Sequence, residues 1–111
     1  MANNIVIVPS FQKKLESKKF RPHLKIIYRL INKLRQSGRN GLKILDVENN
    51  YLVCEMKVNS PPYRLYVIVD QIKDTYYVVH WEHKKRQKQI INELKVKLRI
   101  ATNFVLDKIF T

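Results

Sequence analysis

Glycine is scarce in this sequence, and its scarcity excludes one class of site. The chain has 111 residues but only two glycines, Gly38 and Gly41, and both lie in the segment SGRNG. A Gly-rich phosphate-binding loop and a dinucleotide-binding motif each need several glycines, because the backbone must approach the ligand closely. The sequence therefore contains neither motif.

Cysteine and long apolar runs are also missing. Cys54 is the only cysteine, so no internal disulfide can form, and the spacing of a four-ligand zinc site is absent. No uninterrupted apolar stretch approaches the ~20 residues that a membrane-spanning helix needs. The first ten residues lack the basic start and the cleavage site of a secretory signal. We therefore expect a cytoplasmic protein that has no membrane partner.

Acidic residues are few, and this imbalance is the strongest signal in the composition. Lys and Arg number 22 against 9 Asp and Glu, which gives a formal net charge of +13. A small domain of this charge tends to bind a polyanion, such as RNA, DNA, an anionic membrane or an acidic protein. The acidic residues are spread out, without the paired carboxylates of a glycosidase or a two-metal nuclease. The length and the 45% hydrophobic content suit a single globular domain over residues 1–111.

The hydrophobic pattern predicts an α+β domain. A short strand at 5–8 and a helix beginning near Phe11 come first, followed by a helix over 20–38 that Gly38 ends. Alternating apolar residues then predict four strands, at 43–47, 51–58, 63–71 and 75–81. A helical stripe returns from about Lys84, and its apolar members are Ile90, Leu94, Leu98, Ala101, Val105 and Ile109. This order predicts a small antiparallel sheet with two N-terminal helices and one C-terminal helix, packed on its aliphatic face.

The opposite face of the predicted sheet is polar. Cys54 alternates onto the aliphatic face, where we expect it to be a small core residue. Lys57 and Arg64 lie on consecutive strands joined by the short connection NSPPY, so they come close together on the polar face. Two facing cations repel each other, and a polyanion bound between them would explain why both are present. The alternative is an ordinary solvated sheet face.

The segment HWEHKKRQK, residues 80–88, ends the last predicted strand with groups that bind phosphate or transfer protons. His80 and His83 are three residues apart and would point to opposite faces of a strand, so we expect no metal site. Trp81, together with Tyr66 or Tyr77, has a ring that could stack on unpaired bases. Lys84, Lys85 and Arg86 then begin the last helix, where a bound phosphate would offset the unfavourable position of cations at a helix start.

These residue types suit RNA cleavage without a metal. The ribose 2′-hydroxyl must lose a proton, the phosphate charge must be stabilised, and the 5′-oxygen must gain a proton. A lysine held among other cations has a lowered pKa and can act as a base. Arginine matches phosphate oxygens with its fork of donors, and histidine donates or accepts protons near neutral pH. We therefore expect neither a metal nor a small-molecule cofactor.

The stretch EMKVNSPPYRLYVIVDQIKDTYYVVHWEHKKRQKQII, residues 55–91, resembles the core of RelE/HigB-type toxins of bacterial toxin–antitoxin pairs. In that pattern a strand ends in a basic or polar residue, and YRLYV, a short turn and an aliphatic strand follow. An ending similar to HxKKxQK then starts the last helix. The resemblance covers roughly residues 5–98, and its motif-like positions are 55–89. It implies a RelE-like fold and cleavage of mRNA on the ribosome. It also implies inhibition by a cognate antitoxin protein.

The resemblance assigns roles residue by residue. Lys57 matches the basic position before the turn, and Arg64 matches the phosphate-binding arginine after the tyrosine of YR. Lys84 and Lys85 match the paired lysines that follow the last strand, and His83 matches a histidine or aromatic position. Some relatives carry a catalytic tyrosine near the last helix, and no tyrosine follows Tyr77 here. The acid would then be His83, a lysine or an arginine.

The expected site combines these catalytic residues with groups that bind the rest of the RNA. The expected RNA-binding residues are Tyr66, Trp81, Arg86 and Lys88. Two other functions use similar residues: a gyrase poison of the ParE type, and an RNA-binding module without catalysis. The lysine cluster and Arg64 argue against the gyrase poison.

Overall fold

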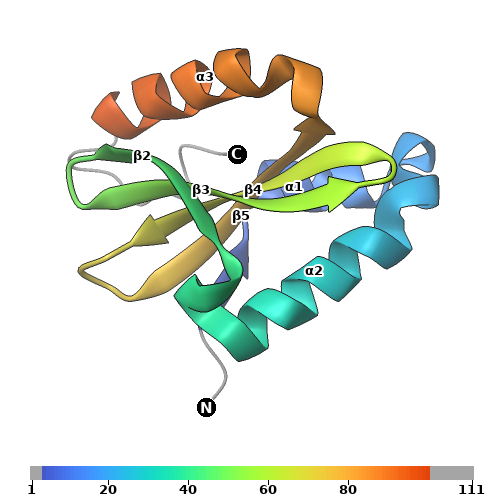
Figure 1. The fold of residues 1–111 in the computed structure, drawn as a ribbon, viewed down its shortest axis with the longest axis horizontal. Helices are drawn as coiled ribbons and strands as arrows, with labels where there is room; N and C mark the ends of the chain where they lie inside the picture. The colour runs from blue at the N-terminus through green and yellow to red at the C-terminus, as the bar shows by residue number, and fades with distance from the viewer. Residues whose placement is uncertain (1–3, 101–111) are drawn as a thin grey trace.

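Five strands form one sheet in the computed structural model, which describes residues 4–100, and three α-helices pack around it (Figure 1). The strands are β1 (Asn4–Ile7), β2 (Lys43–Glu48), β3 (Tyr51–Asn59), β4 (Pro62–Asp70) and β5 (Thr75–His83). The helices are α1 (Pro9–Leu15), α2 (Leu24–Ser37) and α3 (Gln87–Ile100). Three 3₁₀ segments connect them: η1 (Lys18–His23), η2 (Gly38–Gly41) and η3 (Lys84–Arg86).

The sheet is mixed, so the prediction of a purely antiparallel sheet is wrong. Its strand order is β1-β5-β4-β3-β2. Short turns join β2 to β5 into an antiparallel meander, as expected from the sequence. β1 pairs with β5 in parallel, with Asn4 opposite Thr75. A tight turn forces antiparallel pairing only between the strands that it joins. β1 is connected to β5 only through residues 8–74, so no turn fixes its direction.

The hairpin registers follow the sequence pattern closely. Between β2 and β3 the chain turns at Asn49, whose φ of 55° lies in the left-handed region. Asparagine tolerates that region better than other residues with a side chain, and this makes it a turn residue. Between β3 and β4 the short turn places Lys57 directly opposite Arg64. The prediction that these two cations are neighbours on one face is therefore confirmed.

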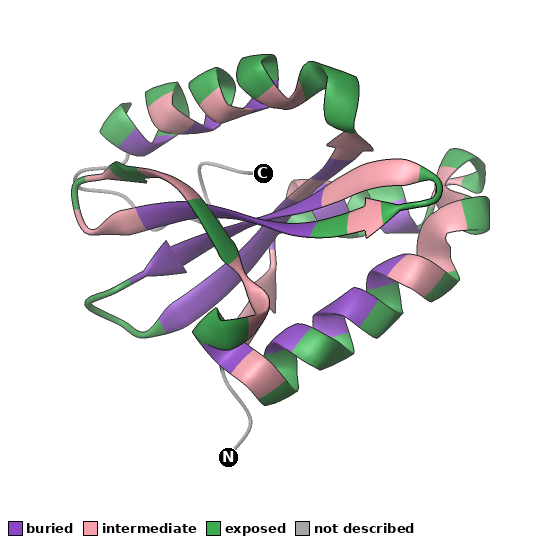
Figure 2. Cartoon of the chain, in the orientation of Figure 1, coloured by how far each residue is buried: buried purple, intermediate pink, exposed green. Residues whose placement is uncertain are grey.

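Helices cover both faces of the sheet, which corrects the expectation that they share one face (Figure 1). The connection after α2 lies against one face, where Gly41 approaches Met56. α3 lies on the other face, where Gln87 donates a hydrogen bond to Glu55 and Lys95 pairs with Asp46 at 3.0 Å. The apolar residues Val53 and Ile68 are buried on this second face, so it too requires a helix above it. Figure 2 shows the buried central strands between the two helical layers.

Local signals place the helix ends. Pro9 opens α1 in its first turn, and Val8 precedes it without a side-chain cap. Gly38 ends α2 with a φ of 55°, as predicted. Cys54 is buried in the core, and burial raises the pKa of its thiol to about 12. Ala101, Val105 and Ile109 of the predicted stripe lie outside the described residues. Within residues 4–100, no helix has both the length and the apolar character needed to cross a bilayer.

Candidate functional site

A pocket lies beside the part of β5 that extends past its edge neighbour. β1 pairs with β5 only as far as Ile7 opposite Val78, so the later residues of β5 have no strand on that side. There the edge faces the end of α1 and the segment η1. The pocket has a volume of about 390 Å³. We call it the β5-edge pocket; its main polar lining residues are Lys14, Lys19, His23, His80, Glu82 and Arg86.

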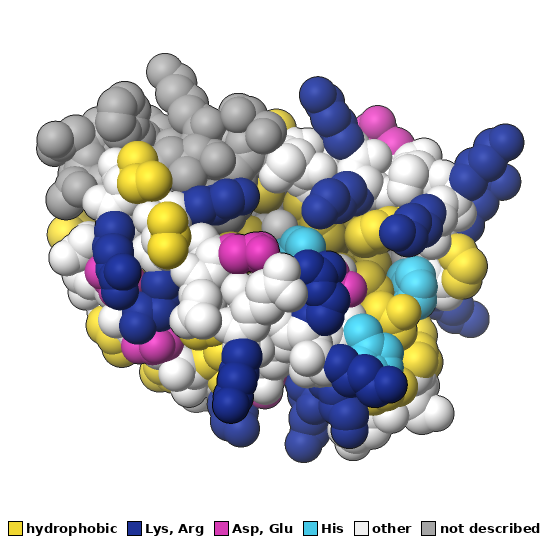
Figure 3. Space-filling view, turned by 90° about the horizontal axis from the view of Figure 1, so that it is seen from above, with side chains coloured by type: hydrophobic (Ala, Val, Ile, Leu, Met, Phe, Trp, Pro, Cys, Tyr) yellow, Lys and Arg dark blue, Asp and Glu magenta, His cyan; other side chains and the backbone are white. Residues whose placement is uncertain are grey.

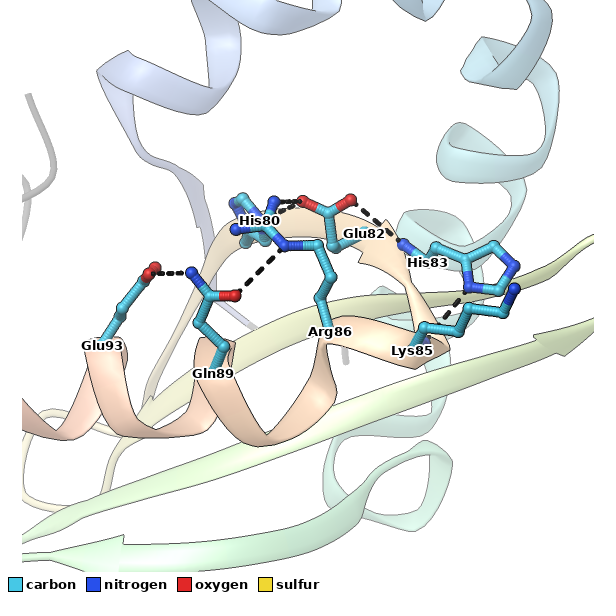
Figure 4. Close-up of polar contacts among 7 residues, drawn as sticks. All are labelled: His80, Glu82, His83, Lys85, Arg86, Gln89 and Glu93. Carbon is cyan, nitrogen blue, oxygen red and sulfur yellow. Dashed lines mark hydrogen bonds and ion pairs between the residues drawn. The ribbon is translucent and has the colours of Figure 1, made fainter.

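Glu82 organises the polar side of the β5-edge pocket (Figure 4). Its Oε2 accepts a hydrogen bond from Arg86 at 2.9 Å and lies 3.3 Å from Nε2 of His80. Its Oε1 accepts from the backbone N–H of His83 at 3.3 Å. A carboxylate that holds both an arginine and a histidine fixes their positions relative to each other. The Nε of Arg86 donates to Oε1 of Gln89 at 3.4 Å, so the Nη2 group is the part of the guanidinium that can bind an anion.

The surroundings of His80 favour the neutral form of its ring. Burial and the nearby charge of Lys14 lower its pKa from 6.5, against the opposing effect of Glu82. Because a carboxylate only accepts, we assign the ring proton to Nε2, which faces Glu82. The lone pair then lies on Nδ1. A neutral imidazole fixed in one tautomer at neutral pH can accept a proton from a substrate.

Aromatic rings form the other side of the β5-edge pocket. Tyr63 and Trp81 stack with their planes 10° apart and their centroids 5.1 Å apart. The His23 ring lies 4.8 Å from Tyr63 and 5.8 Å from Trp81. Phe20 contacts His23 edge-on at 6.3 Å. The pocket thus has one charged side and one aromatic side.

All three histidines of the chain lie in or beside this pocket. His23 and His80 line it, and the His83 ring lies beside the lining residue Tyr63, with the two ring centroids 5.4 Å apart. The Nδ1 of His83 accepts a hydrogen bond from the backbone N–H of Lys85, so His83 caps η3. Figure 3 shows Lys and Arg side chains around the histidines, with apolar side chains between them. Proton-transfer groups and cations are therefore concentrated in one region.

Arg64 is turned into the protein and not toward solvent. Its Nε lies 3.3 Å from Glu55, without the alignment of a hydrogen bond, and the two side chains are 13% and 4% exposed. Its NH1 group donates to the backbone oxygens of Val58 and Tyr63. The facing cations Lys57 and Arg64 therefore need no polyanion between them, because Glu55 already compensates the charge of Arg64.

The other expected catalytic residues divide between the two faces of the sheet. Lys57 is exposed and belongs to the cross-strand row that continues through Arg64 to Glu82. Lys84 and Lys85 are exposed in η3, which lies against β4. His83 lies on the opposite face, beside Tyr63. The structure thus brings Lys57, Arg64 and Glu82 together on one face and separates them from His83.

The expected RNA-binding residues are partly buried. Tyr66 is completely buried, and burial, reinforced by the charge of Glu55, raises its pKa to about 12. Trp81 is 4% exposed, with Tyr63 stacked on one face. Arg86 and Lys88 are exposed, as their expected role requires, and Arg86 lines the pocket. A base can stack on Tyr66 only if the core opens, so we leave this residue out of the candidate site.

Sequence reasoning missed the pocket residues that come from α1 and η1. Lys14, Lys19 and His23 belong to local patterns that indicate only helix surface and turn. His80 and Glu82 were in view, since alternation along β5 places them on one face. Their connection to Lys14 depends on the parallel pairing of β1, which carries α1 to this edge.

No three histidine, cysteine or carboxylate side chains within residues 4–100 gather as a metal-binding group would. Comparison of the chain with protein-family models, with curated proteins and with solved structures finds no match. The candidate site is therefore interpreted from its own geometry and chemistry.

Proposed function

We propose that this chain is a metal-independent endoribonuclease and the toxin of a bacterial toxin–antitoxin pair. One observation carries the enzymatic part: His80 shares the β5-edge pocket with three cationic side chains, Lys14, Lys19 and Arg86. The lowered pKa of His80 favours its neutral, proton-accepting form. That combination supplies a base and a phosphate-binding site in one place. The net charge of +13 supports an RNA substrate.

In the proposed reaction, the 2′-oxygen of a ribose attacks the adjacent phosphorus, and the P–O bond to the 5′-oxygen breaks. Nδ1 of His80 accepts the proton of the 2′-hydroxyl. Arg86, fixed by Glu82, and Lys19 hold the non-bridging phosphate oxygens as charge develops on them. The Lys14 ammonium gives a proton to the departing 5′-oxygen. The products are a 2′,3′-cyclic phosphate and a free 5′-hydroxyl.

The toxin part of the proposal rests on the resemblance of residues 55–91 to RelE/HigB-type toxins, and it includes a RelE-like arrangement of the fold. The substrate is then mRNA on the ribosome, in the cytoplasm. A cognate antitoxin with an acidic or disordered segment would cover the cationic surface and gain order on binding. Lys57, Lys84, Lys85 and Lys88 are exposed and bind the RNA backbone outside the pocket.

Cleavage of mRNA on purified ribosomes tests this function with a matched pair of lysines. Lys13 and Lys14 are neighbours on α1, both exposed, and only Lys14 lines the pocket. We expect Lys14→Ala and His80→Gln each to slow cleavage by ~10²–10⁴, as loss of an acid or base does. Lys13→Ala should change the rate little, because it removes the same charge away from the pocket.

Expression of the protein in growing bacteria adds the test of toxicity. We expect growth arrest with new 5′ ends inside coding regions, measured by primer extension. Growth arrest with intact mRNA and trapped DNA–gyrase complexes would contradict the nuclease function and support a gyrase poison. RNA binding without cleavage, reduced equally by Lys13→Ala and Lys14→Ala, would instead identify a non-catalytic RNA-binding module.

A further inference from the structure

The aromatic side of the β5-edge pocket has no part in the proton transfers described above. Phe20 and His23 come from η1, a segment that contributes no fully buried residue. Phe20 packs against the margin of the core, and both rings also border the opening of the pocket. Tyr63 reaches the same opening from β4 and is half-buried. A nucleotide-binding site needs flat, accessible rings on which the base can stack, and nearby cations that bind the phosphate. This pocket has both.

We propose that this aromatic side holds the base of the nucleotide whose 2′-hydroxyl attacks, so that the pocket binds a nucleoside 3′-phosphate unit of single-stranded RNA. The inference rests on the proposed function and specifies which part of the RNA substrate the pocket binds. A volume of about 390 Å³ falls within the size range of small-ligand sites. Stacking on Phe20, His23 or Tyr63 would fix the base without reading its edge.

The position of His80 determines which phosphate of the nucleotide enters. In RNA the attacking 2′-hydroxyl and the 3′-phosphate belong to the same ribose. His80, which accepts the proton, and Arg86, which holds the phosphate, line the same pocket as the rings. A base on the aromatic side therefore brings its own 2′-hydroxyl to His80 only if its 3′-phosphate lies beside Arg86. A nucleotide bound through its 5′-phosphate would leave that hydroxyl away from His80.

The walls of the pocket require an unpaired base. The pocket is bounded by α1 and η1 on one side and by β4 and β5 on the other, with Arg86 of η3 at its charged end. A base can pass between these elements only after it leaves its stack and its pairing partner. Duplex RNA should therefore bind by its backbone alone.

Trp81 gives a direct measurement, because it is the only tryptophan of the chain and lines the pocket. Its fluorescence is titrated with adenosine and uridine 3′-monophosphates, with the matching 5′-monophosphates, and with inorganic phosphate. The 3′-monophosphates should bind more tightly than the 5′-monophosphates, whose 2′-hydroxyl does not reach His80. They should also bind about tenfold more tightly than inorganic phosphate, the scale of one stacking contact. Phe20→Leu should remove most of that difference, and Lys19→Ala should weaken all ligands.

Two matched variants serve as controls. Tyr28 is an exposed aromatic residue on α2 outside the pocket, and Lys18 neighbours Lys19 without lining it. Tyr28→Leu and Lys18→Ala should leave binding unchanged, and melting temperatures exclude unfolding of Phe20→Leu. Equal affinity for inorganic phosphate and 3′-monophosphates would overturn the base subsite, and so would equal effects of Phe20→Leu and Tyr28→Leu. RNA cleavage that depends on His80 would in that case still support the proposed function. Selective binding of 3′-monophosphates without any RNA cleavage would support the base subsite and contradict the proposed nuclease activity.

Discussion

Arg64 illustrates how the surroundings of a single residue determine its role. The sequence presents it as a phosphate-binding arginine on an open face, yet its charge is matched by Glu55 beneath α3. Glu55 is only 4% exposed and also accepts a hydrogen bond from Gln87. A buried carboxylate that loses its cationic partner keeps the cost of desolvation without the compensating attraction. The fold therefore depends on Arg64 whether or not the guanidinium also reaches RNA.

We predict that Arg64→Ala lowers the free energy of unfolding by ~3–5 kcal/mol, as expected when one partner of a buried pair is removed. Urea denaturation measures this change. The double variant Arg64→Met with Glu55→Gln removes both charges and keeps an acceptor for Gln87, so it should recover most of the loss. Lys57→Ala, on the exposed residue opposite, should stay within about 0.5 kcal/mol of the parent. Equal effects of the Arg64 and Lys57 variants would contradict the pairing.

His80 gives a prediction about pH. Its pKa in the folded protein lies below 6.5, mainly because of burial. As the pH falls through 6.5, the unfolded chain takes up the proton before the folded protein does, so the free energy of unfolding decreases. Above that pH both states are neutral, and the contribution is complete. Denaturation at a series of pH values should show a decrease below about 6.5 that His80→Gln diminishes. Parallel pH profiles for the two proteins would refute this assignment.

At the scale of elements, hairpins were predictable and the crossing connections were not. The short turn after Asn59 and the alternation of Lys57, Arg64 and their neighbours define the β3–β4 register by local spacing alone. The face covered by α3 was predicted to be a polar face, because it carries Glu55, Lys57 and Arg64. The same face also carries Val53 and Ile68, which are buried. Alternation assigns residues to faces, but it does not say which face a later helix will cover.

The bulge in β5 is another element that sequence spacing does not reveal. Tyr66 lies opposite His80, and the next pair is Val67 with Val78, so Val79 is an extra residue. The bulge changes which residues after it point toward α3. It therefore helps to place His80 and Glu82 where the pocket forms. The position of His80 and Glu82 thus depends on the bulge, and the position of Lys14 beside them depends on the parallel pairing of β1. Both features arise from packing over long sequence separations.

The two glycines of the chain make a matched test of how α2 is joined to β2. Gly38 has a φ of 55° and a ψ of −133°, a conformation that side chains disfavour. An added Cβ at Gly41 would meet Ser37 and Met56 at 3.5 and 3.8 Å, which are ordinary contacts. Gly38→Ala should therefore lower the free energy of unfolding by ~1–3 kcal/mol. Gly41→Ala should change it by less than about 1 kcal/mol, and a reversed order in thermal unfolding would contradict this geometry.

For the whole molecule, the net charge of +13 separates the two steps of the proposed function, the binding of RNA and its cleavage. Phosphate contacts release counterions, so affinity falls steeply as salt rises, whereas a bond-breaking step inside a pocket is screened little. We predict that raising salt from about 50 to 200 mM weakens RNA binding at least about tenfold. The single-turnover cleavage rate at saturating protein should remain nearly constant. A rate that falls in parallel with affinity would show that the cations act only as a general patch.

The pairing of β1 with β5 determines when the pocket can form during translation. Asn4 and Thr75 are 71 positions apart, and the side-chain hydrogen bond between them joins β1 to β5, the first and last strands within residues 4–100. α1 and η1 bring Lys14 and His23 to a pocket whose opposite wall is made by β5. A nascent chain that has not yet released β5 from the ribosome therefore has the cations but no pocket, since contacts this distant form late. Under the proposed function, catalytic competence would then appear abruptly when β5 docks, and a chain terminated before β5 would not be toxic.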